Sequence, residues 1–280
     1  MTNPNVWNQL LIWPIINLLM ALYKFFEWLH VPGPLGFAVI GLTIVIRLLL
    51  YPLMAAQLKS AKKMQQLKPH LDALSAKHKD NKQALQQAQL DLYKQHGVNP
   101  AAGCLPLLIQ MPVLIALYNV FYQVLQNGNM TKVVSDINHV VYLSSLKISV
   151  LDLSFFGISL GIKPSQWQSH GWWLLAIPVI TAALQYWQSK LMMPQQTVSA
   201  PVDNKKIQIG QKNDNATEKK DGKKEQNPED TALEMQKQMA MITPLMFGVF
   251  AYQFPLGLAL YWNVFGLFGI MQQLRINAEK

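Results

Sequence analysis

The sequence predicts an all-α membrane protein with five transmembrane helices, an N-terminal interfacial helix and a helical hairpin in water. Only 14% of its 280 residues are charged, against about 25% in a typical soluble domain. The apolar residues gather in runs that approach the roughly 20 residues needed to cross the hydrocarbon core of a bilayer. Lysine-rich stretches separate several of these runs, which is the pattern of a chain that crosses a membrane repeatedly.

Five apolar runs qualify as spans. We place span 1 within 33–55, span 2 within 104–126, span 3 within 171–193, and spans 4 and 5 within 239–274. Pro244 and Pro255 bracket the fourth run. Because proline interrupts a helix, we expect spans 4 and 5 to form a tight hairpin that turns near Pro255.

The N-terminal segment, residues 1–32, is apolar but rich in aromatic residues, and it also carries Lys24 and Glu27. An aromatic-rich amphipathic segment of this kind is typical of a helix that lies in the membrane interface. The alternative is a sixth span, which would move the N-terminus to the other side without moving any other loop.

The polar segments differ in character. Residues 56–103 carry apolar side chains at helical spacing in two halves, broken at Asp80-Asn81, which predicts two antiparallel helices that project into water. Residues 127–170 are nearly neutral, and we expect a loop on the membrane surface. Residues 194–238 have too few apolar side chains to offset the entropy of ordering, so they predict a disordered loop. Residues 275–280 form a short tail.

The basic residues are distributed unevenly between the two sides. The 56–103 hairpin holds eight lysines, the 190–238 segment holds nine, and the tail holds two of the 24 basic residues. Alternating spans place these three regions on one side of the membrane. Because basic residues accumulate on the cytoplasmic side, we expect the hairpin and the C-terminus in the cytoplasm and the N-terminus outside.

Arg47 is the unusual residue of the predicted spans, because none of the five contains an aspartate or glutamate. An arginine at mid-bilayer costs about 2.5–3.5 kcal/mol on insertion scales, and such a residue usually faces a water-filled cavity. The alternative is that Arg47 reaches the cytoplasmic interface. Other polar side chains in the spans add to a predicted hydrophilic groove, whose candidate residues are Arg47, Gln110, Gln185, Tyr261, Trp262 and Asn263. Thr181 and Gln188 also lie in span 3, and we expect Gln188 near its cytoplasmic end.

The spans offer no chemistry for catalysis. They contain no histidine or carboxylate for acid–base work, and the single cysteine, Cys104, allows no intramolecular disulfide. The chain has no glycine-rich phosphate loop with its lysine and no specific nucleic-acid motif. We therefore expect no enzyme activity, no catalytic residue, no metal and no cofactor.

Three motifs, in the same order along the chain, resemble the short bacterial form of the YidC-type membrane insertases, a family with mitochondrial and thylakoid relatives. The first is Arg47-Leu48-Leu49-Leu50-Tyr51-Pro52-Leu53. The second is Asn99-Pro100 followed by Gly103-Cys104-Leu105-Pro106 and Gln110-Met111-Pro112. The third is Phe254-Pro255-x-Gly257-Leu258-x-Leu260-Tyr261-Trp262. The similarity extends from about Val6 to Arg275.

The resemblance implies a function. Members insert newly made membrane proteins into the bacterial plasma membrane and help them fold, alone or with the Sec translocon, and they use no cofactor. Their hairpin and C-terminal region help engage ribosomes or targeting factors. The family's groove arginine, span-3 glutamine and last-span aromatic match Arg47, Gln185 and Trp262.

Two other functions fit the same bulk properties. A small polytopic transporter or channel would also explain an intramembrane arginine, although transporters usually show internal repeats and this sequence has none. A membrane assembly chaperone that inserts nothing is the second alternative.

Overall fold

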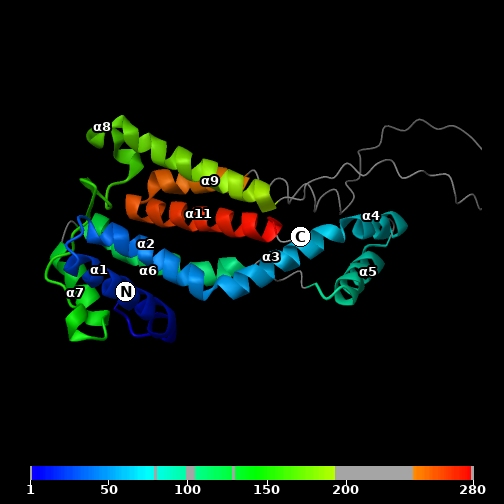
Figure 1. Ribbon diagram of the computed structural model, residues 1–280, viewed down its shortest axis with the longest axis horizontal. Coiled ribbons are helices and arrows are strands. Elements are labelled where there is room, and N and C mark those ends of the chain that lie inside the picture. The colour runs from blue at the N-terminus through cyan, green and yellow to red at the C-terminus, as the bar shows by residue number, and fades with distance from the viewer. Residues whose placement is uncertain (1, 79–80, 99–104, 128–129, 193–241, 279–280) are drawn as a thin grey trace, which may run out of the picture.

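The computed structural model describes residues 2–78, 81–98, 105–127, 130–192 and 242–278, and the all-α prediction is confirmed (Figure 1). The predicted 194–238 loop, the Asn99–Cys104 part of the second motif and the end of the tail lie outside these residues. The helices are α1 (Trp13–Trp28), α2 (Pro34–Leu49), α3 (Tyr51–Gln66), α4 (Lys68–Lys77), α5 (Lys82–Gln95), α6 (Leu105–Asn127), α7 (Met130–Val140), α8 (Trp167–His170), α9 (Ala176–Met192), residues 242–253 and α11 (Leu256–Ala278).

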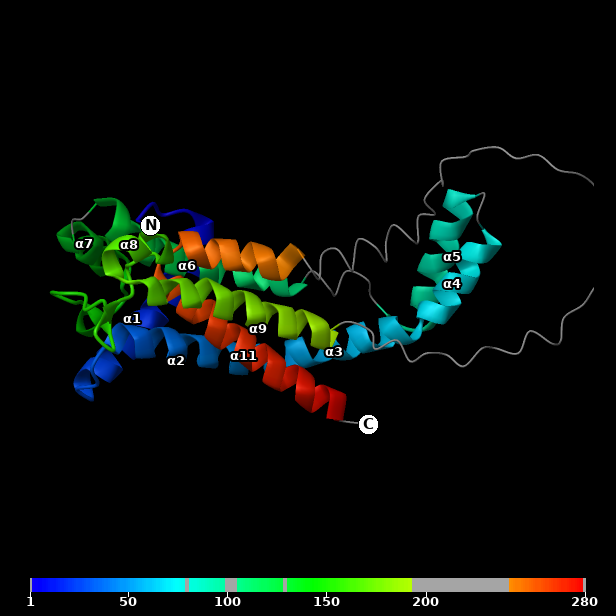
Figure 2. The same ribbon diagram turned by 90° about the horizontal axis from the view of Figure 1, so that it is seen from above.

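The long helices lie side by side, and the two ends of this bundle differ (Figures 1 and 2). One end carries α7, α8 and a two-stranded hairpin in which β1 (Ser154–Phe155) pairs antiparallel with β2 (Ile158–Ser159). At the other end, α3 leads away from the bundle to α4 and α5, and α11 ends on the same side. The lysine-rich segment and the C-terminal helix end therefore lie opposite the 130–175 segment.

Predicted span 1 is divided at Leu50. The axes of α2 and α3 differ by 61° across this break. Pro52 accounts for it, because proline cannot donate to the carbonyl four residues earlier and its ring clashes with that carbonyl. The first half of the predicted hairpin is likewise divided at Leu67, with Pro69 in the first turn of α4. The segment thus forms three helices, where two were predicted. At α5, the Asn81 side chain accepts a hydrogen bond from the Ala84 N–H at 3.0 Å and caps the helix.

The N-terminal helix packs along α2 (Figure 1). Its inward side buries Ile12, Ile16, Leu19, Met20 and Tyr23, whereas Leu10 and Trp28 are about 70% exposed on the outside. By length and composition, residues 8–28 form the one helix of the described chain that could cross a membrane unaided, and the bent α2–α3 pair could be a second. The interfacial placement of residues 1–32 and the number of five spans stay predictions.

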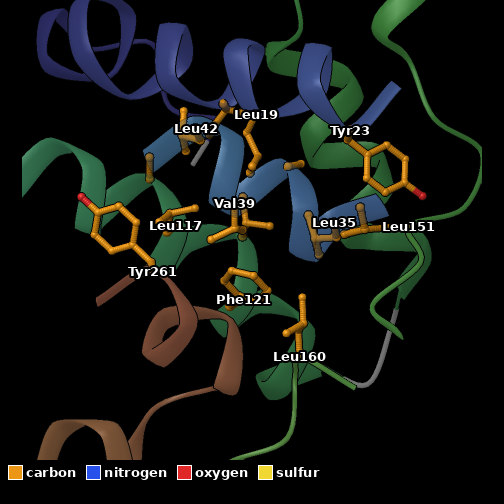
Figure 3. Packing of buried hydrophobic residues seen from close by; sticks show 14 of the residues in the cluster. Leu19, Tyr23, Leu35, Val39, Leu42, Leu117, Phe121, Leu151, Leu160 and Tyr261 are labelled. Carbon is orange, nitrogen blue, oxygen red and sulfur yellow. The ribbon is translucent and has the colours of Figure 1, made fainter. Parts of the chain in front are cut away.

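The core joins α1, α2, α6 and α11 with the segment that follows α7. Figure 3 shows its centre, where Val39 of α2 lies between Leu19 of α1 above it and Phe121 of α6 below it, with Leu117 of α6 beside it. Tyr261 of α11 and Leu160 of the connecting segment complete it, and all of these side chains are at most 3% exposed. Close packing here fixes α11 relative to α2 and α6, and so positions the polar side chains that these three helices carry.

Hydrogen bonds attach the 130–175 segment to the helices. Asn17 of α1 donates to the carbonyl of Val140 at 3.0 Å and accepts from the Tyr142 N–H at 2.7 Å. At the start of α11, the N–H groups of Leu256 and Gly257 donate to the carbonyls of Ile162 and Leu160, each at 2.9 Å. The first N–H groups of a helix have no partner within it, so these bonds satisfy α11 and hold the segment across the end of the bundle.

We expect Asn17→Ala to destabilise this attachment. The side chain is 7% exposed, and its loss leaves the Val140 carbonyl and the Tyr142 N–H without these bonds, at a cost of about 1–2 kcal/mol. Limited proteolysis of the purified protein should then cut the 140–150 region faster than in the parent. Asn8→Ala, which loses only the exposed hydrogen bond from its Nδ2 to the Asn3 carbonyl, is the matched control. Equal cleavage of both variants would contradict the attachment.

Candidate functional site

Arg47 is buried against the middle of α11. It lies in the last turn of α2 and its side chain is 7% exposed. Its Nη2 donates to the carbonyl oxygen of Phe265 at 2.5 Å, and its guanidinium carbon lies 3.5 Å from the centroid of the Phe265 ring. A cation over an aromatic face is attracted by the ring's negative face. Burial of a charge requires compensation. These two contacts with Phe265 of α11 supply part of it and explain why Arg47 is stable in this buried position.

The compensation is incomplete. Arg47 forms no salt bridge within the part of the chain that the structure describes, and its Nε has no hydrogen-bond partner there. The sequence predicts that Arg47 faces a water-filled cavity. In the structure its guanidinium lies between α2 and α11 and is largely covered.

Tyr261 and Gln110 continue the same line of contacts. The Tyr261 ring lies one turn before Phe265, with the ring centroids 5.9 Å apart. Gln110 of α6 donates from Nε2 to the Tyr261 hydroxyl at 2.5 Å. Arg47, Phe265, Tyr261 and Gln110 therefore form a continuous row, which we call the polar row, and it joins α2, α11 and α6.

Two glycines of α11, Gly266 and Gly269, lie against the glutamines Gln185 and Gln188 of α9. A Cβ atom at Gly266 would lie 3.6 Å from Gln185 Nε2, and one at Gly269 would lie 2.5 Å from Gln188 Nε2. The Gly269 position would also lie 3.0 Å from Arg47 Nη2. Gln188 therefore shares this surface of α11 with Arg47, whereas Gln185 lies one helical turn away.

Trp262 and Asn263 lie beside the polar row. Trp262 is 5% exposed and packs against three phenylalanines of the preceding helix and turn, Phe247, Phe250 and Phe254, at centroid distances of 5.5–6.3 Å. The Trp262 Nε1 and the Asn263 Oδ1 are buried and have no hydrogen-bond partner among the described residues. Buried polar atoms are normally paired. Trp262 Nε1 and Arg47 Nε could therefore donate to water or to a bound chain, and Asn263 Oδ1 could accept from either.

The structure thus brings three of the six predicted groove residues, Arg47, Gln110 and Tyr261, into one row. Gln185 borders it, and Trp262 and Asn263 lie on adjacent positions of α11. The prediction omitted Gln188, which it placed near the cytoplasmic end of span 3. The spacing of Gln185 and Gln188, three residues apart on one helix face, and the matching spacing of Gly266 and Gly269 could have identified it. The Thr181 hydroxyl donates to the Ile177 carbonyl of its own helix at 2.9 Å.

Comparison with known proteins decides the family. The model of the family described as 60Kd inner membrane protein matches residues 24–280. The chain belongs to this family. The membrane protein insertase MisCA of Bacillus subtilis (strain 168) is 32% identical, with 98% of this chain and 80% of the relative covered. The membrane protein insertase YidC of Oceanobacillus iheyensis is 29% identical, with 97% and 84% covered. For the YidC of Helicobacter pylori (strain J99) the identity is 28%, and the chain spans only 35% of that relative.

Membership in the 60Kd inner membrane protein family confirms the resemblance seen in the sequence and places the chain in a membrane. A membrane location makes the polar row a candidate for function. In hydrocarbon, a buried arginine has no bulk water to hydrate it, and such residues mark pathways or binding sites. Arg47 and its neighbours are therefore the candidate functional site.

Proposed function

We propose that this chain inserts newly made proteins into the bacterial plasma membrane and that its polar row receives a polar part of the client. Relatives that bear the name membrane protein insertase match 97–98% of the chain, and this supports the activity. The observation that carries the site is the buried Arg47, which has one carbonyl and one aromatic ring as partners and no carboxylate in the described chain.

The proposed mechanism is local replacement of water. A polar client segment must cross hydrocarbon, where each unsatisfied polar group costs several kcal/mol. Arg47, Gln110 and Gln185, with Tyr261, Trp262 and Asn263 beside them, would offer hydrogen-bond partners part of the way across. The apolar client segment then leaves sideways into lipid, driven by burial of its side chains. No nucleotide or other cofactor is needed for this partition.

Insertion by this route requires the row to open. Arg47 is 7% exposed in the structure, so a client reaches it only when α2 and α11 separate or when the side chain leaves the Phe265 carbonyl. An acidic or carbonyl-bearing client segment would replace that carbonyl as the partner of the guanidinium. A hydrogen bond to a charged group is worth about 1.5–3 kcal/mol, which is enough to offset the lost contact.

The orientation and partners are part of the proposal. The lysine-rich α3–α5 segment and the end of α11 face the cytoplasm, and the N-terminus and the 130–175 segment face outward, as the distribution of basic residues favours. The α3–α5 segment would engage ribosomes or targeting factors, and the chain would act alone or with the Sec translocon.

The proposal is tested by insertion of a short single-span client into liposomes that contain only the purified chain. Protease protection of the client's translocated tail reports insertion. We expect protection that depends on the chain and exceeds that of empty liposomes. Client that binds the liposomes without gaining protection would instead favour an assembly chaperone that inserts nothing.

A further inference from the structure

We propose that Gly269 is a positioning residue, which allows Arg47 of α2 and Gln188 of α9 to meet on α11. The inference rests on the proposed function and adds a residue that touches no client itself. It follows from the contacts around a single position on α11, at which three helices converge.

A Cβ atom at Gly269 would crowd the ends of two side chains that come from different helices. A Cβ atom there would lie 2.5 Å from Gln188 Nε2, 3.1 Å from Gln188 Cδ and 3.0 Å from Arg47 Nη2. Non-bonded carbon atoms prefer separations of about 3.5–4.0 Å. Any residue larger than glycine would therefore require Gln188 to turn away and Arg47 to shift by a few tenths of an ångström.

Helix geometry connects this space to the Arg47 hydrogen bond. In an α-helix each Cα–Cβ bond tilts toward the N-terminus, so the side chain of residue 269 would lean over the preceding turn. That turn contains the Phe265 carbonyl, which accepts from Arg47 Nη2. With glycine at 269 the guanidinium reaches this carbonyl, and a methyl group there would push it away.

The neighbouring glycine provides the contrast. A Cβ atom at Gly266 would lie 3.6 Å from Gln185 Nε2, 3.8 Å from Gln188 Oε1 and 4.0 Å from Leu184 Cβ, which are ordinary contact distances. Both glycines are buried in α11 and both face α9. Only Gly269 is required for the approach of Arg47, so Gly266→Ala is a matched control for Gly269→Ala.

The test compares both variants, as full chains in liposomes, with two clients that differ only by aspartate or asparagine in the translocated tail. We expect Gly269→Ala to lower insertion of the aspartate client about tenfold and that of the asparagine client much less. Gly266→Ala should stay within about twofold of the parent for both. The double variant Arg47→Ala/Gly269→Ala should insert no worse than Arg47→Ala, because Gly269 acts through Arg47.

A packing defect alone would give different results. Equal losses for the two clients, or a double variant clearly worse than Arg47→Ala, would overturn the inference. The double variant Gly269→Ala/Gln188→Ala removes the closest contact and provides a second test if Gly269→Ala does not fold. If this double variant inserts the aspartate client as well as the parent does, the role through Arg47 is overturned. If Arg47→Ala lowers insertion and Gly269→Ala does not, only this inference fails. If neither has an effect, the proposed site fails as well.

Discussion

Replacing Arg47 with alanine is expected to lower client insertion about ten- to a hundredfold. This range corresponds to the loss of one hydrogen bond to a charged group, about 1.5–3 kcal/mol, at about 1.4 kcal/mol for each factor of ten. Insertion should fall most for clients with acidic tails, because the guanidinium is the only cation in the five predicted spans apart from Lys190 near the end of span 3. The measurement is protease protection of the tail in liposomes.

The stability of Arg47→Ala should be equal to that of the parent or slightly higher, although its insertion activity falls. Arg47 loses hydration on burial, and its partners are one carbonyl and one ring, so its removal also removes a cost of about 2.5–3.5 kcal/mol. We therefore expect the apparent unfolding temperature of Arg47→Ala in detergent to stay near that of the parent. Arg275→Ala, an exposed arginine on α11, is the matched control and should retain insertion. Unfolding of Arg47→Ala, or an equal loss of insertion in Arg275→Ala, would contradict a functional role.

Gly257→Ala is expected to destabilise the folded protein by about 3 kcal/mol, the upper end of the roughly 1–3 kcal/mol that overpacking of a core typically costs. A Cβ atom at Gly257 would overlap the ring of Phe121, with Phe121 Cε2 only 2.6 Å away. That ring is fully buried between α6 and α11, and the Gly257 N–H donates a hydrogen bond to the Leu160 carbonyl. Neither the Phe121 ring nor the Gly257 backbone can therefore move freely. Unfolding in detergent, followed by tryptophan fluorescence, measures the change.

The control for this substitution is Gly41→Ala in α2. A Cβ atom there would lie 3.5 Å from the nearest atoms of Leu22 and Phe26, so the methyl group fits. Alanine also favours a helix over glycine by up to about 1 kcal/mol. We expect Gly41→Ala to equal or exceed the parent in stability. A Gly257→Ala variant as stable as Gly41→Ala would show that α6 and α11 pack less closely than the contact between Phe121 and Gly257 requires.

The helical class was predictable because long apolar runs leave few alternatives. The breaks at Leu50 and Leu67 were harder to predict, although Pro52 and Pro69 lie two residues after each. Proline is accepted in the first turn of a helix, so its presence alone does not tell a new helix from a continuing span.

The candidate site was predictable in its residue types more than in its arrangement. A lone arginine in an apolar run identified Arg47 without any structure. Its partner is a backbone carbonyl 218 residues away, and every residue except proline offers the same carbonyl and N–H groups. Gln110 and Tyr261 were chosen for polarity, but their direct contact depends on how α6 packs against α11. The link from Asn17 to Val140, across 123 positions, has the same origin in tertiary packing.

The most direct test of the proposed site is cysteine crosslinking to a client arrested during insertion. In a Cys104→Ser background, one variant carries Gln188→Cys, which places the thiol beside Gly269 and Arg47. The other carries Leu267→Cys on the opposite side of α11, where the side chain is 46% exposed. With a single cysteine in the client's polar tail, we predict a disulfide adduct at position 188 that clearly exceeds the adduct at 267. Equal adducts at the two positions, or a stronger one at 267, would contradict passage of the client through the polar row.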